Sequence, residues 1–488
     1  KGEYDPRFFD YQTSLTYKLS DKVSVNFLGN AAINNYRFIP ATRTTNFGTS
    51  TAAKQFKVYF DGSEKDRFET FFGAATLNFT PDKKNTVDLL LSGFLSNELV
   101  AYDISGEYWL DQAGTSGEGS IGGELGVGKY REHARNRLKA SVLSAQLRGA
   151  SQLGRHNLAY GIGLNLEKIH DRTREWELRD SAGFSLPVNP DALQVIYNLD
   201  SRHDINSTRF SGYIQDTYRL STSAGYLNIS GGVRFGYWSF NKEMLVSPRL
   251  SLGFVPDAAP RWAFRFATGM YYQSPFYKEF RMPVADADGN NIIVLNNEIK
   301  SPRSIQVIGG ADFTFRAFSR PFKFSAEAYY KNLNNLIPYE LDNLKLVYAG
   351  QNLCNGMAAG VDFKLFGQFV PGSDSWISLS LMKTQENLNG VKVPLPSDRR
   401  YSMALFFTDY FPKFPKLKFS LRGILNDGLP MTPPRSSRDK GYFRAPAYKR
   451  VDIGLSYALL SPHTEGSQSR TGIARHLKSV WLGVDVFN

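Results

Sequence analysis

Residues 227–238 read LNISGGVRFGYW, and this stretch decides the class of fold. Leu227, Ile229, Val233 and Phe235 occupy odd positions, whereas polar and charged residues occupy the even positions between them. Successive side chains of a β-strand point to opposite faces, whereas side chains on the same face of an α-helix recur about every 3.6 residues. The stretch therefore predicts a strand with one apolar face and one polar face.

The same alternation recurs along the chain, in residues 158–167, 417–425 and 451–457. The mean hydropathy is −0.33, and no run reaches the ~18 apolar residues that a transmembrane helix needs. A strand of a membrane barrel exposes only one face to lipid, so its average hydropathy stays near neutral. The 26 Tyr and 36 Phe residues are typical of aromatic girdles at two membrane interfaces.

The connections between strands separate a membrane barrel from a soluble β-sandwich. Short polar turns alternate with long stretches without clear periodicity, and tight periplasmic turns with long outer loops are typical of outer-membrane barrels. The short turns lie at 20–22, 81–84, 154–156, 257–260 and 413–416. The long stretches, which we expect to be irregular, lie at 34–66, 101–136, 171–206, 280–301 and 427–445.

Pairing the segments predicts an all-β fold, a large antiparallel transmembrane β-barrel with nine hairpins and about 18 strands. The alternation also predicts which way individual side chains point. We expect these residues to face lipid: Leu227, Ile229, Val233, Phe235, Phe419, Leu421, Val451 and Ile453. We expect Arg234, Arg422 and Lys364 to face the lumen.

The two ends of the sequence suggest a partial barrel. The chain opens just before a strand and closes on 481–488 (WLGVDVFN), which reads as the middle of a strand. Unpaired backbone groups in lipid each cost several kcal/mol, so an open sheet edge there is unfavourable. We therefore expect residues 1–488 to lack strands at both ends, with any export signal upstream.

Other classes of protein find little support in the sequence. The net charge is +12, but Lys and Arg are spread along the whole chain, which argues against nucleic-acid binding. The single Cys354 can form no internal disulfide, and the six His residues show no metal-ligand spacing. We predict no catalytic residues, no metal site and no cofactor.

Two motifs partly match the sequence patterns of known binding sites but lack residues that those patterns require. Residues 123–130 (GELGVGKY) resemble a phosphate-binding loop, but Tyr130 stands where Ser or Thr is required, so we interpret them as a glycine-rich outer loop. Residues 286–291 (DADGNN) hint at a Ca²⁺ loop, but the glycine and the closing Glu are not in place. We interpret this second motif as a hairpin turn, with a loop Ca²⁺ site left open.

Several stretches resemble the barrel of Bacteroidetes-type TonB-dependent receptors. They are 211–216 (SGYIQD), 247–251 (SPRLS), 269–275 (GMYYQSP), 327–331 (EAYYK), 396–401 (PSDRRY) and 485–488 (DVFN). Each is weak alone, but their order and spacing together are fairly specific, and they cover nearly the whole chain. Family members have a 22-stranded barrel with an N-terminal plug inside it, so the resemblance implies that this chain spans roughly strands 4 to 21.

The resemblance implies active import of a nutrient across the outer membrane: a glycan, a peptide or a metal chelate. The plug domain and the last strand would lie outside residues 1–488. The implied partners are the TonB–ExbB–ExbD complex, a SusD-like surface lipoprotein, and outer-membrane lipid and lipopolysaccharide. A transporter-like barrel that serves as a structural or binding subunit is the main alternative, and a passive porin is a weaker one.

Eight polar or aromatic residues on the predicted lumen face are candidates for contacts with substrate or plug. Polar lumen faces are the rule in such barrels, so each residue could equally serve only to hydrate the wall. The candidates are Arg234, Trp238, Arg265, Tyr271, Gln273, Asp362, Lys364 and Arg422.

Overall fold

The structure is a computed structural model of the chain. It describes residues 2–49, 52–112, 124–180, 193–286, 291–342, 345–370, 373–411, 413–432, 437–460 and 479–487. No helix in this part of the chain is long and apolar enough to cross a membrane.

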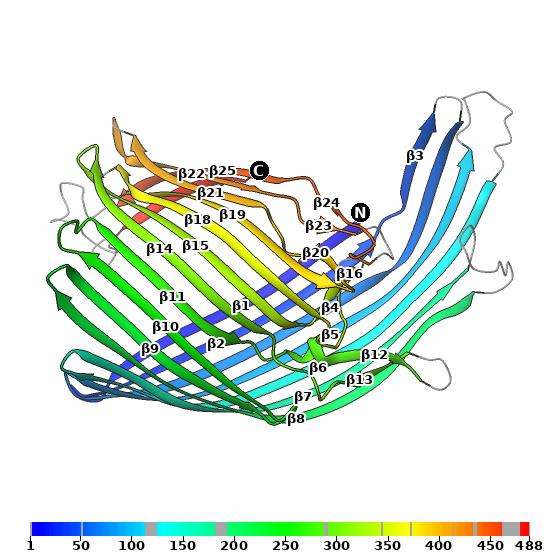
Figure 1. Cartoon of the computed structure of the whole chain (residues 1–488). Helices are drawn as coiled ribbons and strands as arrows, with labels where there is room; N and C mark the ends of the chain where they lie inside the picture. Colours follow the sequence, from blue (N-terminus) through cyan, green and yellow to red (C-terminus); the bar gives the residue numbers. More distant parts are fainter. Residues whose placement is uncertain are drawn as a thin grey trace, which may run out of the picture.

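One antiparallel sheet dominates the fold and curves into the wall of a barrel (Figure 1). Among the described residues it contains 22 strand segments. Four of these, β3, β12, β13 and β20, are short additions at one end, and the remaining 18 follow one another in chain order from β1 to β26. The fold is therefore the large antiparallel barrel that the alternation predicts.

The wall strands are long and mostly adjacent in sequence. They are β1 (Gly2–Lys18), β2 (Val23–Pro40), β4 (Ala52–Asp82), β5 (Asn85–Gln112), β6 (Glu124–Leu153), β7 (His156–Arg179), β8 (Gln194–Thr222), β9 (Gly225–Trp238), β10 (Glu243–Pro256), β11 (Trp262–Tyr272), β14 (Arg303–Ala317), β15 (Arg320–Leu336), β18 (Cys354–Val370), β19 (Ser373–Leu388), β21 (Tyr401–Phe411), β22 (Phe414–Asn426), β25 (Tyr448–Leu460) and β26 (Val480–Val486). The shorter elements are β3 (Arg43–Thr49), η1 (Tyr277–Phe280), β12 (Arg281–Ala285), β13 (Asn291–Leu295), β16 (Tyr339–Asp342), β17 (Lys345–Tyr348), β20 (Val391–Pro394), β23 (Pro430–Met431) and β24 (Phe443–Arg444).

Tight turns close the hairpins at one end of the barrel. Between β4 and β5, the Asp82 carboxylate accepts hydrogen bonds from the backbone N–H groups of Lys84 and Asn85, at 2.7 and 2.9 Å. Between β14 and β15, Phe318 and Ser319 both have positive φ, at 53° and 61°. Two successive positive φ values match the twist of the flanking strands, which favours a two-residue hairpin.

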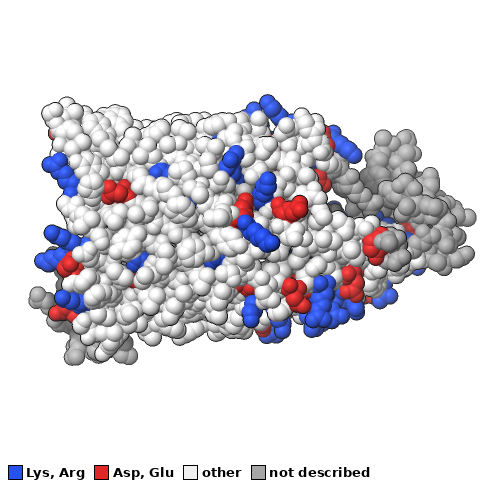
Figure 2. Space-filling model, turned by 60° about the horizontal axis from the view of Figure 1, so that its bottom comes forward, with Lys and Arg blue, Asp and Glu red and all other residues white. Residues whose placement is uncertain are grey.

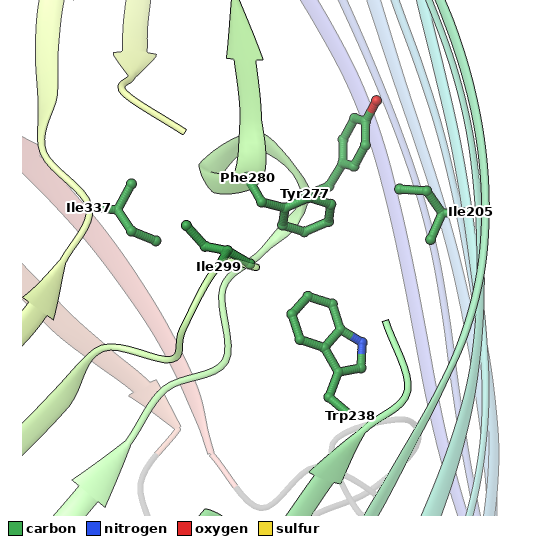
Figure 3. Packing of buried hydrophobic residues seen from close by; sticks show 6 residues of the cluster. All are labelled: Ile205, Trp238, Tyr277, Phe280, Ile299 and Ile337. Carbon is green, nitrogen blue, oxygen red and sulfur yellow. The ribbon is translucent and has the colours of Figure 1, made fainter. Parts of the chain in front are cut away.

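The register assigns every wall residue to one of two faces. We call the face that carries Trp238 the lumen face, because chain segments on the concave side of the wall pack against it (Figure 3). We call the opposite face the lipid face. Arg234 pairs with Tyr213 and Ser247 on the neighbouring strands. It lies on the same face of β9 as Trp238, because four residues separate the two. Following the pairings across the sheet places Lys364 and Arg422 on this lumen face too.

The lipid face carries an apolar band that ends in aromatic rings near the tight turns. Trp262 lies 4.6 Å from Phe313 between ring centroids, and Phe313 and Phe315 stack at 5.6 Å. Figure 2 shows a broad area with few charged side chains on one side of the molecule, between charged side chains at its left edge and a larger number over its right half. This distribution fits a lipid-facing band bordered by an interfacial girdle.

Three stretches that we expect to be irregular are largely strand instead. Residues 34–66 contain the end of β2, all of β3 and the start of β4, and β4 pairs with β5 as far as Lys54 and Gln112. Residues 101–136 and 171–206 likewise extend β5 to β8. The prediction of irregular loops is wrong for the described residues there. Beyond the membrane the outer face of the strands carries charged residues instead of apolar ones, so the lipid-facing pattern ends while the backbone pairing continues. Residues 50–51, 113–123 and 181–192 lie outside the described part.

The assignment of faces can be tested on two neighbouring residues of β19. We expect Leu379→Arg, on the lipid face, to destabilise the folded barrel by about 2–4 kcal/mol, because it places a charge in the bilayer. Ser380→Arg is the matched control, since Ser380 pairs with Asp362 and Ser402 on the lumen face. Denaturant titration of the barrel in phospholipid measures both. Equal losses for the two variants would contradict the register.

Candidate functional site

The segment between β11 and β14 folds against the lumen face and forms a buried apolar cluster there. Phe280 of η1 and Ile299 are 1% exposed, and Trp238 of the wall is 3% exposed. The rings of Trp238 and Phe280 meet edge to face at 5.6 Å. Figure 3 shows them gathered between the wall strand that carries Ile205 and the segment that carries Ile337. We call residues 273–286 and 291–302 the inner segment.

A buried carboxylate on β7 holds η1 to the wall. Asp171 is 5% exposed and accepts a hydrogen bond of 2.7 Å from the Tyr277 hydroxyl. Arg281 Nη2 lies 3.5 Å from Asp171 Oδ2 and donates a 2.8 Å hydrogen bond to Thr173 Oγ1. Burial, together with the neighbouring Asp171, raises the pKa of Tyr277 above its usual range. Tyr277 therefore stays protonated and remains a hydrogen-bond donor.

Two further contacts fix the ends of the inner segment. The Arg209 guanidinium lies 4.0 Å above the Trp238 ring and 2.7 Å from Glu167, and it donates a 3.4 Å hydrogen bond to the Pro275 carbonyl. At the other end, the Ser301 hydroxyl and backbone N–H donate to the Glu243 carboxylate at 2.6 and 3.0 Å. Charged groups on the wall thus satisfy backbone groups of the segment that would otherwise be buried unpaired.

A recess of about 410 Å³ remains between the inner segment and the wall strands β5 to β8. Its wall side carries acidic and amide groups, and its segment side carries two cations and several apolar side chains. Its polar lining includes Glu98, Asn136, Asp171, Glu175, Lys278 and Arg281. A pocket with opposite charges on opposing sides and apolar surface between them suits a polar ligand of moderate size.

A second set of buried ion pairs holds the loops at the same end of the barrel. Arg438 pairs with Glu386 at 2.5 Å and donates to the carbonyls of Pro394 and Tyr339, both at 3.1 Å. Asp398, which is fully buried, pairs with Arg444 and also accepts from Thr384. These contacts tie the segments that carry Tyr339, Pro394 and Arg438 to one another.

The structure spreads the eight candidate residues along the lumen face rather than gathering them. Trp238 belongs to the cluster under the inner segment. Arg265 is paired within the wall, with Asp312 at 2.6 Å and Glu327 at 3.0 Å. The Tyr271 ring lies 4.4 Å below the Arg249 guanidinium.

Arg234 lies on β9, between Tyr213 and Ser247 of the neighbouring strands. The other four candidates lie farther round the wall or at a strand end. Lys364 lies 5.4 Å from the Trp376 ring and Arg422 lies 5.9 Å from the Phe406 ring. Asp362 pairs in register with Glu327, and the backbone N–H of Gln273 donates to Pro302 just beyond β11. A role of these residues in contacting substrate or plug stays a prediction.

Sequence reasoning missed the residues that build the recess. Asp171 and Thr173 lie in a stretch expected to be irregular, and they become neighbours of Tyr277 and Arg281 only through the fold. One signal was present in the sequence. Residues 280–301 carry several large apolar side chains in a stretch expected to be irregular, which favours a segment that packs against another part of the protein.

The two near-miss motifs fall partly outside the described residues. Residues 124–130 continue strand β6, so the interpretation as an outer loop is wrong for them, and residue 123 lies outside the described part. Residues 287–290 also lie outside it, but β12 and β13 pair on either side of them, as a hairpin requires. In the residues that the structure describes, no group of three or more His, Cys, Asp and Glu could hold a metal ion.

Comparison with known proteins identifies a matching family and solved structures of similar fold. Residues 5–484 match the family model described as TonB dependent receptor-like, beta-barrel. The structure is similar to the RagAB peptide transporter (10% identity, 98% of this chain and 68% of that chain covered, TM-score 0.56). It is also similar to the outer membrane transporter YddB from Escherichia coli (11% identity, 93% and 69% covered, TM-score 0.50). A search of curated proteins gives no significant match.

Proposed function

The chain belongs to the TonB-dependent receptor family of outer-membrane transporters, which are not enzymes, and from that premise we propose that it actively imports a nutrient captured in the lumen recess. The observation that carries this proposal is the inner segment, which packs into the barrel and leaves a recess of about 410 Å³ against the wall. A passage narrowed by a folded segment and lined by opposite charges favours selective capture over free diffusion.

The recess supports a glycan, a peptide or a metal chelate as the substrate, and its charges favour a peptide. Lys278 and Arg281 lie on one side, and Glu98 and Glu175 on the other. Lys278 Nζ lies 3.9 Å from Glu98 Oε2 across the recess, so the two charged ends of a short peptide could bind by replacing this long ion pair with a closer partner for each group. The RagAB structure, which has the same fold, is described as a peptide transporter. Bacteroidetes as the source and a SusD-like lipoprotein as a surface partner belong to this proposal.

Import through so wide a barrel also requires a plug and an energy source. A barrel of about 22 strands encloses a lumen that is too wide to be selective unless it is filled. We therefore propose that the full-length protein carries a plug of roughly 100 residues or more. A flexible segment ahead of it would pair with TonB of the TonB–ExbB–ExbD complex by strand addition.

The main rival function is a structural or binding subunit of an outer-membrane assembly, and a porin is a weaker one. A structural or binding subunit does not need an open recess, so a side chain that fills the recess would leave the assembly intact. Import requires the recess to be empty before ligand arrives. The two functions therefore differ in how they respond to a side chain that fills the recess.

We expect Val100→Trp to lower the apparent affinity of uptake by about tenfold or more, because Val100 lines the recess and the larger side chain would fill part of it. Uptake of a labelled peptide pool, a labelled oligosaccharide mixture and labelled ferric chelates measures the effect. Leu95→Trp is the matched control, since Leu95 lies on the same strand but on the exposed lipid face.

Unchanged uptake of all three probes in the Val100→Trp variant would contradict capture in the recess. Reduced uptake of the peptide pool alone would support the peptide substrate. Reduced uptake of the chelates or the oligosaccharides alone would keep import and replace the substrate class.

A further inference from the structure

The hairpin of β16 and β17 is separate from the barrel wall. Among the described residues its two strands pair only with each other, and Tyr339 stands opposite Tyr348. The wall itself continues past the hairpin, because β15 and β18 pair directly with one another. A two-stranded hairpin alone is marginally stable in water, so its position depends on what it packs against.

The base of this hairpin is fixed to the inner segment. Ile337, just before β16, is 7% exposed and points toward Phe280 (Figure 3). Just after β17, the Gly350 carbonyl accepts a 2.8 Å hydrogen bond from Asn296 Nδ2. Gly350 has a φ of 72°, and a Cβ atom there would lie 2.8 Å from the Arg281 carbonyl oxygen, so the position favours glycine. Both ends of the hairpin are therefore held in place.

Strand β17 covers part of the recess. Leu346, Val347 and Tyr348 all line it. The Tyr348 ring meets the Phe276 ring edge to face, with 5.4 Å between centroids, which holds β17 against the start of η1. Leu346 and Val347, however, are 51% and 47% exposed. Two aliphatic side chains thus stand at the recess with about half of their surface uncovered by the protein.

Further apolar surface lines the recess from the wall and from the inner segment. Tyr197 of β8 and Ile293 of β13 contribute to it, together with the charged groups described above. Burial of apolar surface is the dominant favourable term in most association reactions. Leu346 and Val347 gain this burial only from a ligand that brings an apolar group of its own into the recess.

From these contacts we propose that the β16–β17 hairpin selects the substrate by an apolar side chain, so that the recess takes short peptides that carry a large aliphatic residue. This inference rests on the proposed function, since it names which peptides are imported. The charged groups of the recess bind the ends of the peptide, and every peptide has such ends. Leu346 and Val347 contact the side chain and therefore discriminate between peptides of equal length and charge.

The first test removes the apolar surface of the hairpin in Leu346→Ser/Val347→Ser. The probes are short alanine peptides with Leu at each position in turn, and the matching set with Ser. Their binding to the purified full-length protein is measured by isothermal titration calorimetry. We expect the unsubstituted protein to bind the Leu set about tenfold more tightly than the Ser set, and the variant to bind both sets about equally. A hairpin with only a structural role would weaken both sets by the same factor.

The matched control is Met431→Ser/Phe443→Ser. These two residues face each other in the hairpin of β23 and β24, are 45% and 52% exposed, and do not line the recess. The control therefore removes a similar amount of exposed apolar surface from another two-stranded hairpin. We expect it to keep the tenfold preference for the Leu set.

The second test replaces the apolar contact with a charge. We expect Leu346→Glu to bind alanine peptides that carry Lys about tenfold more tightly than the Leu set, because the new carboxylate forms a charge-assisted hydrogen bond with the Lys ammonium group. Leu346 is half-exposed, so the substitution buries no charge within the protein. Met431→Glu is the control and should leave the preference for the Leu set unchanged.

The outcomes separate this proposal from the proposed function. A preference for the Leu set that is the same in Leu346→Ser/Val347→Ser and in the unsubstituted protein would overturn selection by the hairpin and leave peptide import intact. Equal affinity of the unsubstituted protein for the Leu and Ser sets would do the same. Binding of neither set by the unsubstituted protein would overturn the peptide substrate, and with it this inference.

Discussion

We expect cells that lack TonB to accumulate no more labelled ligand than cells that lack this gene, although ligand still binds at the cell surface. The physical reason is the width of the barrel, which must be blocked to be selective and which then opens only when work is done on the block. The recess and the loops that hold it belong to the barrel, so capture of ligand does not depend on that work. The measurement compares total and protease-protected label in strains with and without TonB, using the intact gene in both.

The control for this experiment is a strain in which TonB is restored from a plasmid, where accumulation should return. Equal accumulation with and without TonB would contradict active import and would leave the structural subunit or the porin. Loss of surface binding together with accumulation would show that TonB affects assembly of the receptor, and this result would also contradict the prediction as stated.

The wall of the barrel could be predicted from the sequence because the residues of each strand alternate between an apolar face and a polar face. Residues 227–238 alternate because one side meets lipid and the other meets water, and this contrast is local to the strand. The same reasoning failed for the described part of residues 101–136, where the outer face of the extended strands carries charged residues such as Asp103 and Arg135 instead of apolar ones. Backbone hydrogen bonds hold those strands together, and such bonds do not depend on the pattern of side chains.

The recess could not be predicted because its residues come from distant parts of the chain. Asp171 and Tyr277 are separated by 106 positions, and only the curvature of the wall and the inward fold of the inner segment bring them together. The alternation identified Trp238 as a lumen residue but gave no information on what covers it. Its neighbours Phe240 and Phe280 come from its own hairpin and from η1.

Trp238 is the residue whose loss we expect to release the inner segment. It is 3% exposed, its ring contacts those of Phe240 and Phe280 at 5.0 and 5.6 Å, and Arg209 lies 4.0 Å above it. Truncation of a buried Trp to Ala typically costs about 3–5 kcal/mol. The wall strands are held by their own backbone ladder, so most of this loss should fall on the docking of the segment rather than on the barrel.

A loss of about 3 kcal/mol would shift the docking equilibrium by roughly 100-fold. We therefore expect amide hydrogen exchange in residues 277–301 to accelerate by about that factor in Trp238→Ala, while exchange in β5 to β8 stays slow. The reporter amides include Asn296, whose N–H donates to the Phe280 carbonyl at 2.9 Å. Trp262→Ala is the control, because Trp262 is 38% exposed in the aromatic girdle of the lipid face. Unchanged exchange in residues 277–301 would show that Asp171 and Glu243 hold the segment without Trp238, since their hydrogen bonds to Tyr277 and Ser301 remain in the variant.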